Sequence, residues 1–522
     1  MAGLGVLLAL SAGCSSNPGS TSSSGGQTAG GGSGGTTAGG GSGGTTTGPT
    51  GGMGGSGGMA GSGGMAGSGG VGGSGGMAGS GGAGGGGGIQ AEWVKVFPIA
   101  KESTIDDLAT DAEGNVYVAG GVQKGPTDLG AGAEPCDTLG GCGFLLKLDP
   151  NGNLLWHKLW NLGQLDFVHV AAITWTADGL LAALRWAHGK DQGSLDLGLG
   201  ALTPHGTGNI VIARLDADGN AVWNQGYGSC GGGICSVEPL SIVSEGATDF
   251  TVLGQFAPFP IDIGLGSMAQ LGAFDYPMFI ARFVNGAPVW QHAFNGEGGG
   301  KAVRVVKTPD GGYSMAGMHL GAMLGASFIP PTINGESPFS GHYDADGNPV
   351  WGHVYNDTSG ANTRNGGGDS TGALLISGYG TNQIDTGAGQ LPLGSVAGFL
   401  LKIDANGQTV FSTAKDKNAF TFNCLSGVAT DPSDAMLWVA RRETPQGNEI
   451  GFTGRVTKLD VSGAEQWELI APDFGPSEVV SDPQGSVIVG GKYRNQLTIG
   501  KDGPSAPANG ASAFVAKFAS MP

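Results

Sequence analysis

Residues 210–223 read IVIARLDADGNAVW, a stretch in which apolar and polar residues alternate on both sides of an Asp-Gly turn. Alternation with a period of two predicts strands, and a tight turn containing Asp-Gly or Asn-Gly predicts that two strands form a β-hairpin. The same pattern recurs five times, as FLLKLDPNGNLLW (144–156), MFIARFVNGAPVW (278–290), FSGHYDADGNPVW (339–351), GFLLKIDANGQTVF (398–411) and GRVTKLDVSGAEQW (454–467). A basic residue or His recurs at one position of this hairpin: Lys147, Arg214, Arg282, His342, Lys402 and Lys458.

A second hairpin precedes each of these segments. Clear copies are LATDAEGNVYVAGG (108–121), VVKTPDGGYSMAGM (305–318), VATDPSDAMLWVA (428–440) and VVSDPQGSVIVGG (479–491). Two hairpins per repeat make a four-stranded antiparallel unit, and regular repetition of such a unit is typical of a β-propeller.

The two ends of the repeat region complete each other. The seventh unit begins at Val479 and reaches AFVAKF (513–518), which leaves it one strand short. The segment AEWVKVF (91–97) supplies a strand with Trp93 at the position of the hairpin aromatic. We therefore predict an all-β fold, a seven-bladed β-propeller of four-stranded blades, closed by the N-terminal strand. The outer-strand aromatic, Trp in six units and Phe411 in one, is expected to pack between blades.

Three of the repeated stretches carry a family resemblance. They are G-N-V-Y-V-A-G (114–120), F-L-L-K-L-D (144–149) and D-x-D-G-N-x-V-W (216–223). The chain resembles the SBBP-type β-propeller repeats of bacterial surface lipoproteins, common in myxobacteria-like organisms, over about residues 92–522. The resemblance implies the seven-bladed fold and no single reaction.

The N-terminal residues 1–14, MAGLGVLLALSAGC, resemble a bacterial lipoprotein signal peptide. The resemblance implies that Cys14 is lipidated and becomes the mature N-terminus. Because Ser15 follows the cysteine, it also implies an outer-membrane or cell-surface location in a Gram-negative bacterium. No Lys or Arg precedes Cys14, so we expect translation to start further upstream.

Residues 15–88 consist almost entirely of Gly, Ser, Thr, Ala and Met. This composition cannot bury a core, so we predict a disordered tether, with the propeller over 89–522. The net charge is −18, and no charged residue precedes Glu92. An acidic domain of this kind argues against nucleic acid and against direct contact with anionic lipid. We expect a monomer that reaches the membrane only through its lipid anchor.

The remaining cysteines form two close pairs, Cys136 with Cys142 and Cys230 with Cys235, and leave Cys424 single. In an exported protein, close pairs in Gly-rich loops are candidate disulfides. Zinc is the alternative, but no histidine spacing supports it.

A stretch of the form Asp-x-Gly-x-Gly recurs four times. It offers candidate calcium ligands at Asp128, Asp196, Asp262 and Asp385. We favour turn-capping for these aspartates, because a calcium site needs six or more clustered oxygens. We therefore predict no metal and no cofactor.

No catalytic motif occurs in the sequence, so we predict no catalytic residues and no enzyme. The long connections between strands are expected to share one face, which is the predicted binding face. Acidic residues near the blade junctions are candidates to converge on the central funnel: Asp166, Glu238, Glu297 and Asp357. Two hypotheses follow, a binding or scaffolding module for a surface protein or glycan, and a polysaccharide hydrolase or lyase. A tight cluster of Asp, Glu, His and Arg in the funnel would favour the second hypothesis.

Overall fold

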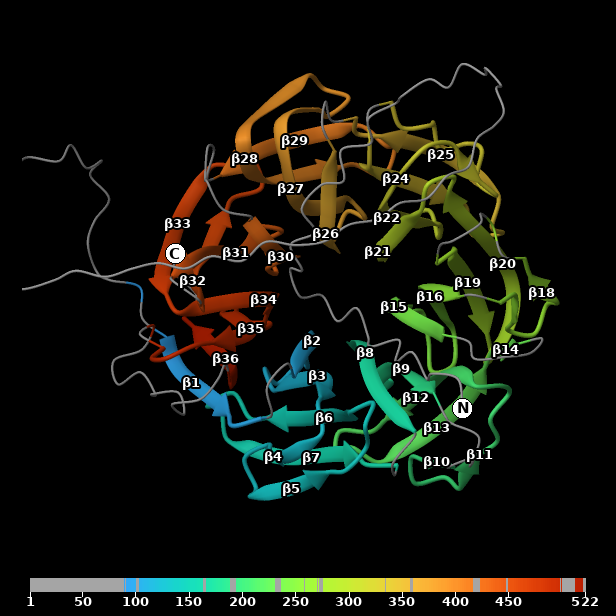
Figure 1. Ribbon diagram of the computed structural model, residues 1–522, viewed down its shortest axis with the longest axis vertical. Helices are drawn as coiled ribbons and strands as arrows, with labels where there is room; N and C mark the ends of the chain where they lie inside the picture. The colour runs from blue at the N-terminus through green and yellow to red at the C-terminus, as the bar shows by residue number, and fades with distance from the viewer. Residues whose placement is uncertain are drawn as a thin grey trace, which may run out of the picture. The chain divides into compact units, whose positions relative to one another are not determined.

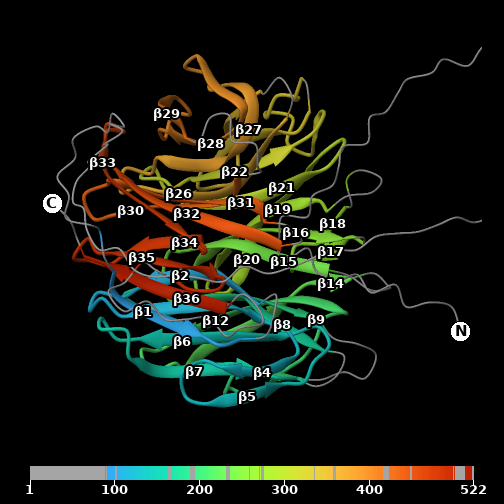
Figure 2. The same ribbon diagram turned by 60° about the vertical axis from the view of Figure 1, so that its left-hand side comes forward.

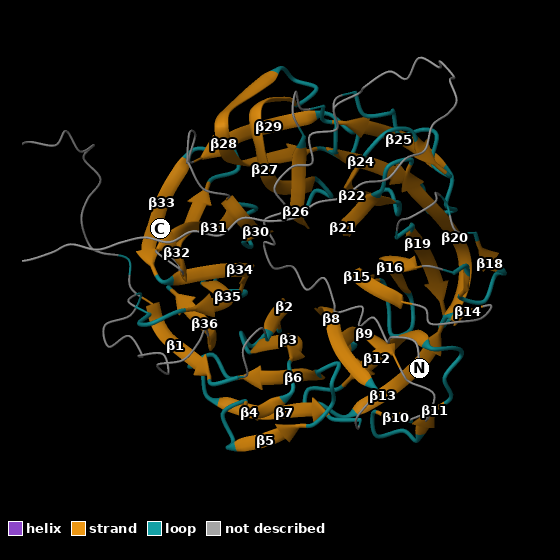
Figure 3. Cartoon of the chain, in the orientation of Figure 1, coloured by secondary structure: helices purple, strands orange, loops and turns teal. Residues whose placement is uncertain are grey.

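The computed structural model describes residues 89–519 apart from short gaps. The gaps are 90, 100–102, 163–165, 188–193, 231–235, 258, 270, 272–275, 334, 357–359, 416–422, 447–448, 498 and 500–511. In this described part all regular structure is β-strand (Figure 3), and no helix there is long and apolar enough to cross a membrane. The predicted lipidation at Cys14 and the predicted tether over 15–88 lie outside the described residues.

Seven antiparallel sheets stand around a common centre as the blades of a propeller (Figure 1). From the centre outward, blade 1 consists of β2 (Thr104–Thr110), β3 (Val116–Val122), β6 (Cys142–Leu148) and β7 (Leu154–Trp160). Blade 2 consists of β8 (Phe167–Thr176), β9 (Gly179–Ala187), β12 (Gly208–Leu215) and β13 (Ala221–Tyr227). Blade 3 consists of β15 (Ser236–Ser244), β16 (Phe250–Ala257), β19 (Met278–Val284), β20 (Ala287–Gly296) and a short fifth strand, β23 (Met323–Leu324).

The next three blades repeat the same order of strands. Blade 4 consists of β21 (Gly300–Lys307), β22 (Tyr313–His319), β24 (Ser337–Tyr343) and β25 (Pro349–Val354). Blade 5 consists of β26 (Ala361–Gly368), β27 (Leu374–Asp385), β28 (Gln390–Ile403) and β29 (Thr409–Lys415). Blade 6 consists of β30 (Asn423–Thr430), β31 (Met436–Gln446), β32 (Glu449–Leu459) and β33 (Glu465–Pro472).

Blade 7 closes the ring with strands from both ends of the described chain. It consists of β34 (Phe474–Ser481), β35 (Val487–Tyr493), β36 (Ser512–Phe518) and β1 (Ala91–Phe97). β1 pairs antiparallel with β36, with Val94 opposite Ala516. The predicted seven-bladed propeller, closed by the N-terminal strand, is therefore confirmed.

The hydrophobic core lies between the faces of neighbouring blades. One cluster, for example, joins Leu181 and Ile212 of blade 2 to Val252 and Phe279 of blade 3. The blades follow one another face to face around the ring, so that β2 lies beside both β8 and β34 (Figure 2). Each sheet thus buries both faces, which is why middle strands such as β6 and β12 are buried along their whole length.

The outer aromatic of six blades packs on the hairpin turn of the next blade, which is the predicted packing between blades. Gly152 has a φ of 82°, and a Cβ there would lie 2.7 Å from the Trp93 ring. Trp93 Nε1 also donates a hydrogen bond to the Pro150 carbonyl at 2.9 Å. The contact recurs between Trp156 and Gly219, Trp223 and Gly286, Trp290 and Gly347, Trp351 and Gly407, and Phe411 and Gly463. Glycine supplies both the turn geometry and the space for the indole.

The recurring basic residue forms a buried ion pair in most blades. Its partner is an acidic residue in the first hairpin turn of the same blade. The pairs are Lys147–Asp111 at 3.1 Å, Lys402–Asp369, Lys458–Asp431 and Lys517–Asp482 at 2.8 Å, and Arg282–Glu245 at 3.0 Å. In blade 4, His342 Nε2 lies 3.2 Å from the carboxylate of the exposed Asp310. In blade 2, Arg214 instead donates to Thr176 Oγ1 at 2.9 Å and to the Ala247 carbonyl at 2.8 Å. We call this set the turn-end pairs, because it ties the first hairpin of a blade to the second.

Candidate functional site

All seven innermost strands break their pairing at the same level. Each contains a β-bulge, in which one residue has no partner on the adjacent strand. The bulged residues are Asp106, Ala171, Leu240, Val303, Arg364, Leu425 and Ser477. The bulges lie toward the first residues of these strands, at the end of the ring where the blade-to-blade connections enter. This is the face predicted from the long connections to be the binding face.

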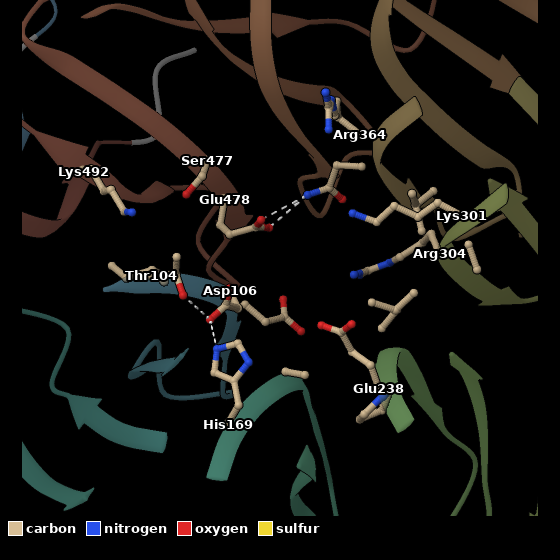
Figure 4. A pocket seen from close by; sticks show the side chains of 18 of the residues that line it. Thr104, Asp106, His169, Glu238, Lys301, Arg304, Arg364, Ser477, Glu478 and Lys492 are labelled. Carbon is tan, nitrogen blue, oxygen red and sulfur yellow. Dashed lines mark hydrogen bonds and ion pairs between the residues drawn. The ribbon is translucent and has the colours of Figure 1, made fainter. Parts of the chain in front are cut away.

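A cavity of about 200 Å³ lies at the level of these bulges. All seven blades line it, and we call it the mouth cavity. Its charged side chains are Asp106, Asp107, His169, Glu238, Lys301, Arg304, Arg364, Arg441, Glu478 and Lys492. Figure 4 shows Lys301 and Arg304 extending into the cavity from one side, with Asp106 and Glu478 across from them.

Two carboxylates at the wall of the cavity accept hydrogen bonds from neighbouring side chains. Asp106 Oδ2 accepts from Thr104 Oγ1 at 2.9 Å and lies 2.7 Å from His169 Nε2 (Figure 4). Glu238 Oε2 accepts from Gln255 Nε2 at 3.2 Å. Hydrogen bonds of this kind fix the direction of each carboxylate.

Two further carboxylates are more enclosed. Asp107 accepts backbone N–H bonds at both oxygens, from Leu108 at 2.9 Å and from Ile173 of the next blade at 2.8 Å. Glu478 of blade 7 accepts from Asn365 Nδ2 of blade 5, at 3.2 and 3.1 Å to its two oxygens. All four carboxylates of the mouth cavity are therefore hydrogen-bonded.

The two cations of β21 differ from these carboxylates. Within the described part of the chain, neither the Lys301 ammonium nor the Arg304 guanidinium makes a hydrogen bond or an ion pair within 4 Å. Arg364 does have a partner, because its Nη2 donates to the Tyr379 hydroxyl at 2.9 Å and its guanidinium lies 5.1 Å above the Tyr379 ring. Lys301 and Arg304 therefore have donors to offer to a ligand.

Burial changes the protonation of several of these groups. Desolvation raises the pKa of Asp107 to about 6, against the attraction of Arg304. Desolvation and the nearby Asp107 raise the pKa of Glu478 well above its usual range. Burial lowers the pKa of Lys301, while Glu238 opposes that effect. For His169, burial lowers the pKa but the Asp106 carboxylate outweighs it, so the net shift is upward. Asp107 and Glu478 therefore keep their protons at pH values at which exposed carboxyl groups have lost them.

The acidic candidates from the sequence have different outcomes. Glu238 lines the mouth cavity. Asp166 is buried outside its lining, and Glu297 is exposed on a loop away from it. Asp357 lies outside the described residues. The sequence analysis missed Asp106, Asp107, His169, Lys301, Arg304 and Glu478, because these residues do not repeat from blade to blade.

The Asp-x-Gly-x-Gly stretches form small outer hairpins and do not line the mouth cavity. They are β4–β5 (Gly125–Asp128 and Ala133–Cys136), β10–β11 (Leu195–Asp196 and Ala201–Leu202), β17–β18 (Ile261–Asp262 and Ser267–Met268) paired with β14 (Ser229–Cys230), and the end of β27–β28. In each, the aspartate Oδ1 accepts a backbone N–H from the turn, as Asp262 does from Gly264 at 2.7 Å and Gly266 at 3.1 Å. Asp128, Asp196 and Asp385 make equivalent bonds. These aspartates cap turns.

The two predicted disulfides have different outcomes. Cys136 and Cys142 are bonded, which links the end of β5 to the start of β6. Cys235 lies outside the described residues, in the gap 231–235 that follows β14. The predicted bond between Cys230 and Cys235 is therefore not among the disulfides of the described part, and it stays a prediction. No group of three or more His, Cys, Asp or Glu residues suited to a metal ion occurs in the described ranges.

Comparison with known proteins gives similar solved structures but no family. No family model and no curated protein match the chain, so membership of the SBBP-type family stays a prediction. Among solved structures, hydrazine synthase of Kuenenia stuttgartiensis is similar at 12% identity and a TM-score of 0.39, over 74% of this chain and 92% of that one. The Dos1 propeller is similar at 8% identity and a TM-score of 0.37, over 82% of this chain and 96% of that one. A member of the duf4221 family from Bacteroides vulgatus is similar at 9% identity and a TM-score of 0.35, over 83% of this chain and 98% of that one. Likeness at this level carries no argument about fold or activity.

Proposed function

We propose that the propeller is a binding module whose mouth cavity takes up a polar ligand, either a small molecule or the end of a glycan. The propeller fold fits a binding or scaffolding module, and loops over a rigid ring are a common place for recognition. The observation that carries the proposal is the contrast within the cavity: its carboxylates are hydrogen-bonded, whereas Lys301 and Arg304 have no hydrogen-bond or ion-pair partner among the described residues.

The proposal includes the presentation of this cavity at the cell surface. Lipid at Cys14 would hold the chain at the outer membrane, and residues 15–88 would act as a flexible tether. A flexible chain of ~74 residues has a root-mean-square reach of about 50 Å. A Cys14→Ser variant, expressed from the native start, is expected to leave the membrane fraction. Retention of that variant in membranes would contradict the lipid anchor.

Cleavage of a polysaccharide is the second candidate. The mouth cavity does bring Asp, Glu, His and Arg together, which is the arrangement that the sequence analysis associated with catalysis. The raised pKa values of Asp107 and Glu478 favour it further, because a general acid must keep its proton near working pH. Binding remains the better supported function, because both oxygens of Asp107 are already occupied by backbone N–H groups and Glu478 is held by Asn365.

A cavity-filling variant tests the proposal on an array of immobilised glycans. Ala171 lines the mouth cavity, so Ala171→Trp places an indole where the ligand would lie. The matched control is Ala201→Trp, which adds the same side chain at an exposed site on the outer hairpin β10–β11. We expect the glycans retained by the natural protein to be lost by Ala171→Trp alone. Equal loss or equal retention by both variants, with both folded by circular dichroism, would contradict the proposal.

The same array separates binding from cleavage. Retained glycans that stay intact over hours, by mass spectrometry of the supernatant, support the binding module. Release of sugar by the natural protein and not by Glu478→Gln would establish the second candidate in its place.

A further inference from the structure

We propose that the ligand of the mouth cavity is an acidic sugar, whose carboxylate binds Lys301 and Arg304 while its hydroxyl groups meet the carboxylates and amides of the facing blades. This inference rests on the proposed function and adds the chemical class of the ligand.

The charge of the mouth cavity runs against the charge of the protein. The whole chain has 42 acidic and 24 basic residues, whereas the cavity lining has four carboxylates and five Lys or Arg residues. Burial raises the pKa of Asp107 and Glu478, which reduces the negative charge of the lining, and it also lowers the pKa of Lys301. A positive cavity in an acidic protein focuses the local field on an anion.

The bulge in β21 gives the two cations their shared direction. Lys301 and Arg304 are three residues apart, and in a regular strand such residues point to opposite faces. The bulge at Val303 inserts one unpaired residue between them, so Ala302 pairs with Gly317 and Arg304 with Ala316. Both side chains therefore reach the cavity (Figure 4). Two cations on one bulge form a fork that can hold both oxygens of a carboxylate.

The remaining wall favours an anion that also carries hydroxyl groups. Glu238 and Asp106 keep unused acceptor sites, since an ionised carboxyl group can accept about four hydrogen bonds. Gln255 lies beside Glu238 and Asn365 beside Glu478, each with an amide group. A compact inorganic anion would meet the negative side chains without compensation, whereas sugar hydroxyls can donate to them. The mixture of charges thus fits one ligand that has a carboxylate at one end and hydroxyl donors elsewhere.

The size of the cavity fits a single sugar unit. Its volume of about 200 Å³ is below the roughly 300–1,000 Å³ of clefts that enclose drug-sized ligands. An acidic unit can arrive as a free monosaccharide or as the end of a polyuronate chain. Both carry the same carboxylate and hydroxyl chemistry.

Isothermal titration calorimetry with sodium glucuronate and with glucose tests the inference. The two sugars differ only at the carboxylate, so glucose is the matched neutral probe. We expect glucuronate to bind at least tenfold more tightly than glucose, and Arg304→Gln or Lys301→Gln to weaken glucuronate about 10- to 100-fold. The control is Lys124→Gln, the same change at an exposed lysine outside the cavity, which we expect to bind as the natural protein does. Titrations with galacturonate and with an oligogalacturonate distinguish a free sugar from a chain end, because the two ligands share one sugar configuration. The oligogalacturonate binds more tightly than galacturonate only if more than one unit is held.

The outcomes separate this inference from the proposed function. Equal affinity for glucose and glucuronate, with both lost in Ala171→Trp, would keep the binding module and overturn the acidic ligand. Binding of phosphate in place of glucuronate, lost in Arg304→Gln, would likewise overturn the sugar. Affinity for glucuronate that is unchanged in Arg304→Gln, Lys301→Gln and Ala171→Trp would place the ligand elsewhere and overturn both.

Discussion

The two ends of the blades use charge in opposite ways. At the turn end, most blades bury one cation against one anion, as Lys458 and Asp431 do at 2.8 Å. At the mouth, the charged residues change from blade to blade, from His169 to Glu238 to Lys301 at the position two residues before the bulge. Features that repeat in every blade serve the ring, which every blade must close. Features that differ between blades break the symmetry and can recognise an asymmetric ligand.

This difference predicts opposite effects on stability. A buried pair that loses one partner leaves an uncompensated charge, which is costly. An unpaired cation in a cavity already carries a desolvation cost, so its removal should raise the free energy of unfolding. Sites that hold ligands commonly lower stability in this way.

The largest effect is expected from breaking a turn-end pair. Asp431→Ala leaves Lys458 buried without its partner, and their side chains are 4% and 7% exposed. We expect the free energy of unfolding to fall by about 3–5 kcal/mol in chemical denaturation. The control is Asp346→Ala in an exposed hairpin turn, with a change within about 0.5 kcal/mol. Similar losses in both variants would remove the distinction between turn-end pairs and ordinary surface charges.

The next effect concerns Asp107 and pH. Its pKa of about 6 lies above the ordinary value of 3.8, so the folded state binds this proton more tightly than the unfolded state. Stability from this group is therefore greatest below pH 4 and is lost as the pH rises toward 6. Between pH 4 and 7 the natural protein should lose about 2 kcal/mol relative to Asp107→Asn, measured by urea denaturation at each pH. Parallel pH profiles of the two proteins would show that Asp107 ionises normally.

A smaller gain is expected from Lys301→Met. Burial lowers the pKa of Lys301, which means that the charged form is disfavoured in the folded state. Methionine keeps the length of the side chain and removes the charge, so the free energy of unfolding should rise by about 1 kcal/mol. A melting temperature below that of the natural protein would indicate that Lys301 stabilises the ring, as the turn-end lysines do.

The smallest effect is expected at the outer hairpins. Asp262 accepts two backbone N–H bonds, so Asp262→Ala should cost about 0.5 kcal/mol through the lost turn cap. Millimolar calcium and EDTA should leave the melting temperature of both proteins unchanged. A calcium-dependent rise in the melting temperature that disappears in Asp262→Ala would show that Asp262 binds a metal ion.

The fold could be predicted because its determinants repeat. Trp156, Gly219 and the turn aspartates recur at fixed spacing, and alternation identifies the strands around them. The partners of the recurring basic residues could not be predicted, since Lys147 and Asp111 lie on different hairpins. Repetition identifies a position, whereas a contact between hairpins depends on how the strands pair.

The mouth cavity could not be predicted for a related reason. A bulge interrupts alternation by a single residue, so Lys301 and Arg304 would be assigned to opposite faces of a regular strand. Glu238 was identified only because it lies near a blade junction. Comparing the seven inner strands after aligning their bulges would have shown the charged, non-repeating positions together.

The most direct test of the account is a crystal structure of the full chain soaked in glucuronate or in the best glycan from the array. We expect the ligand in the mouth cavity, with its carboxylate within about 4 Å of Arg304 or Lys301. The account would be contradicted by a ligand ordered only elsewhere, such as the outer groove between β11, β13 and β17 that Thr203, Asn224 and Asp262 line.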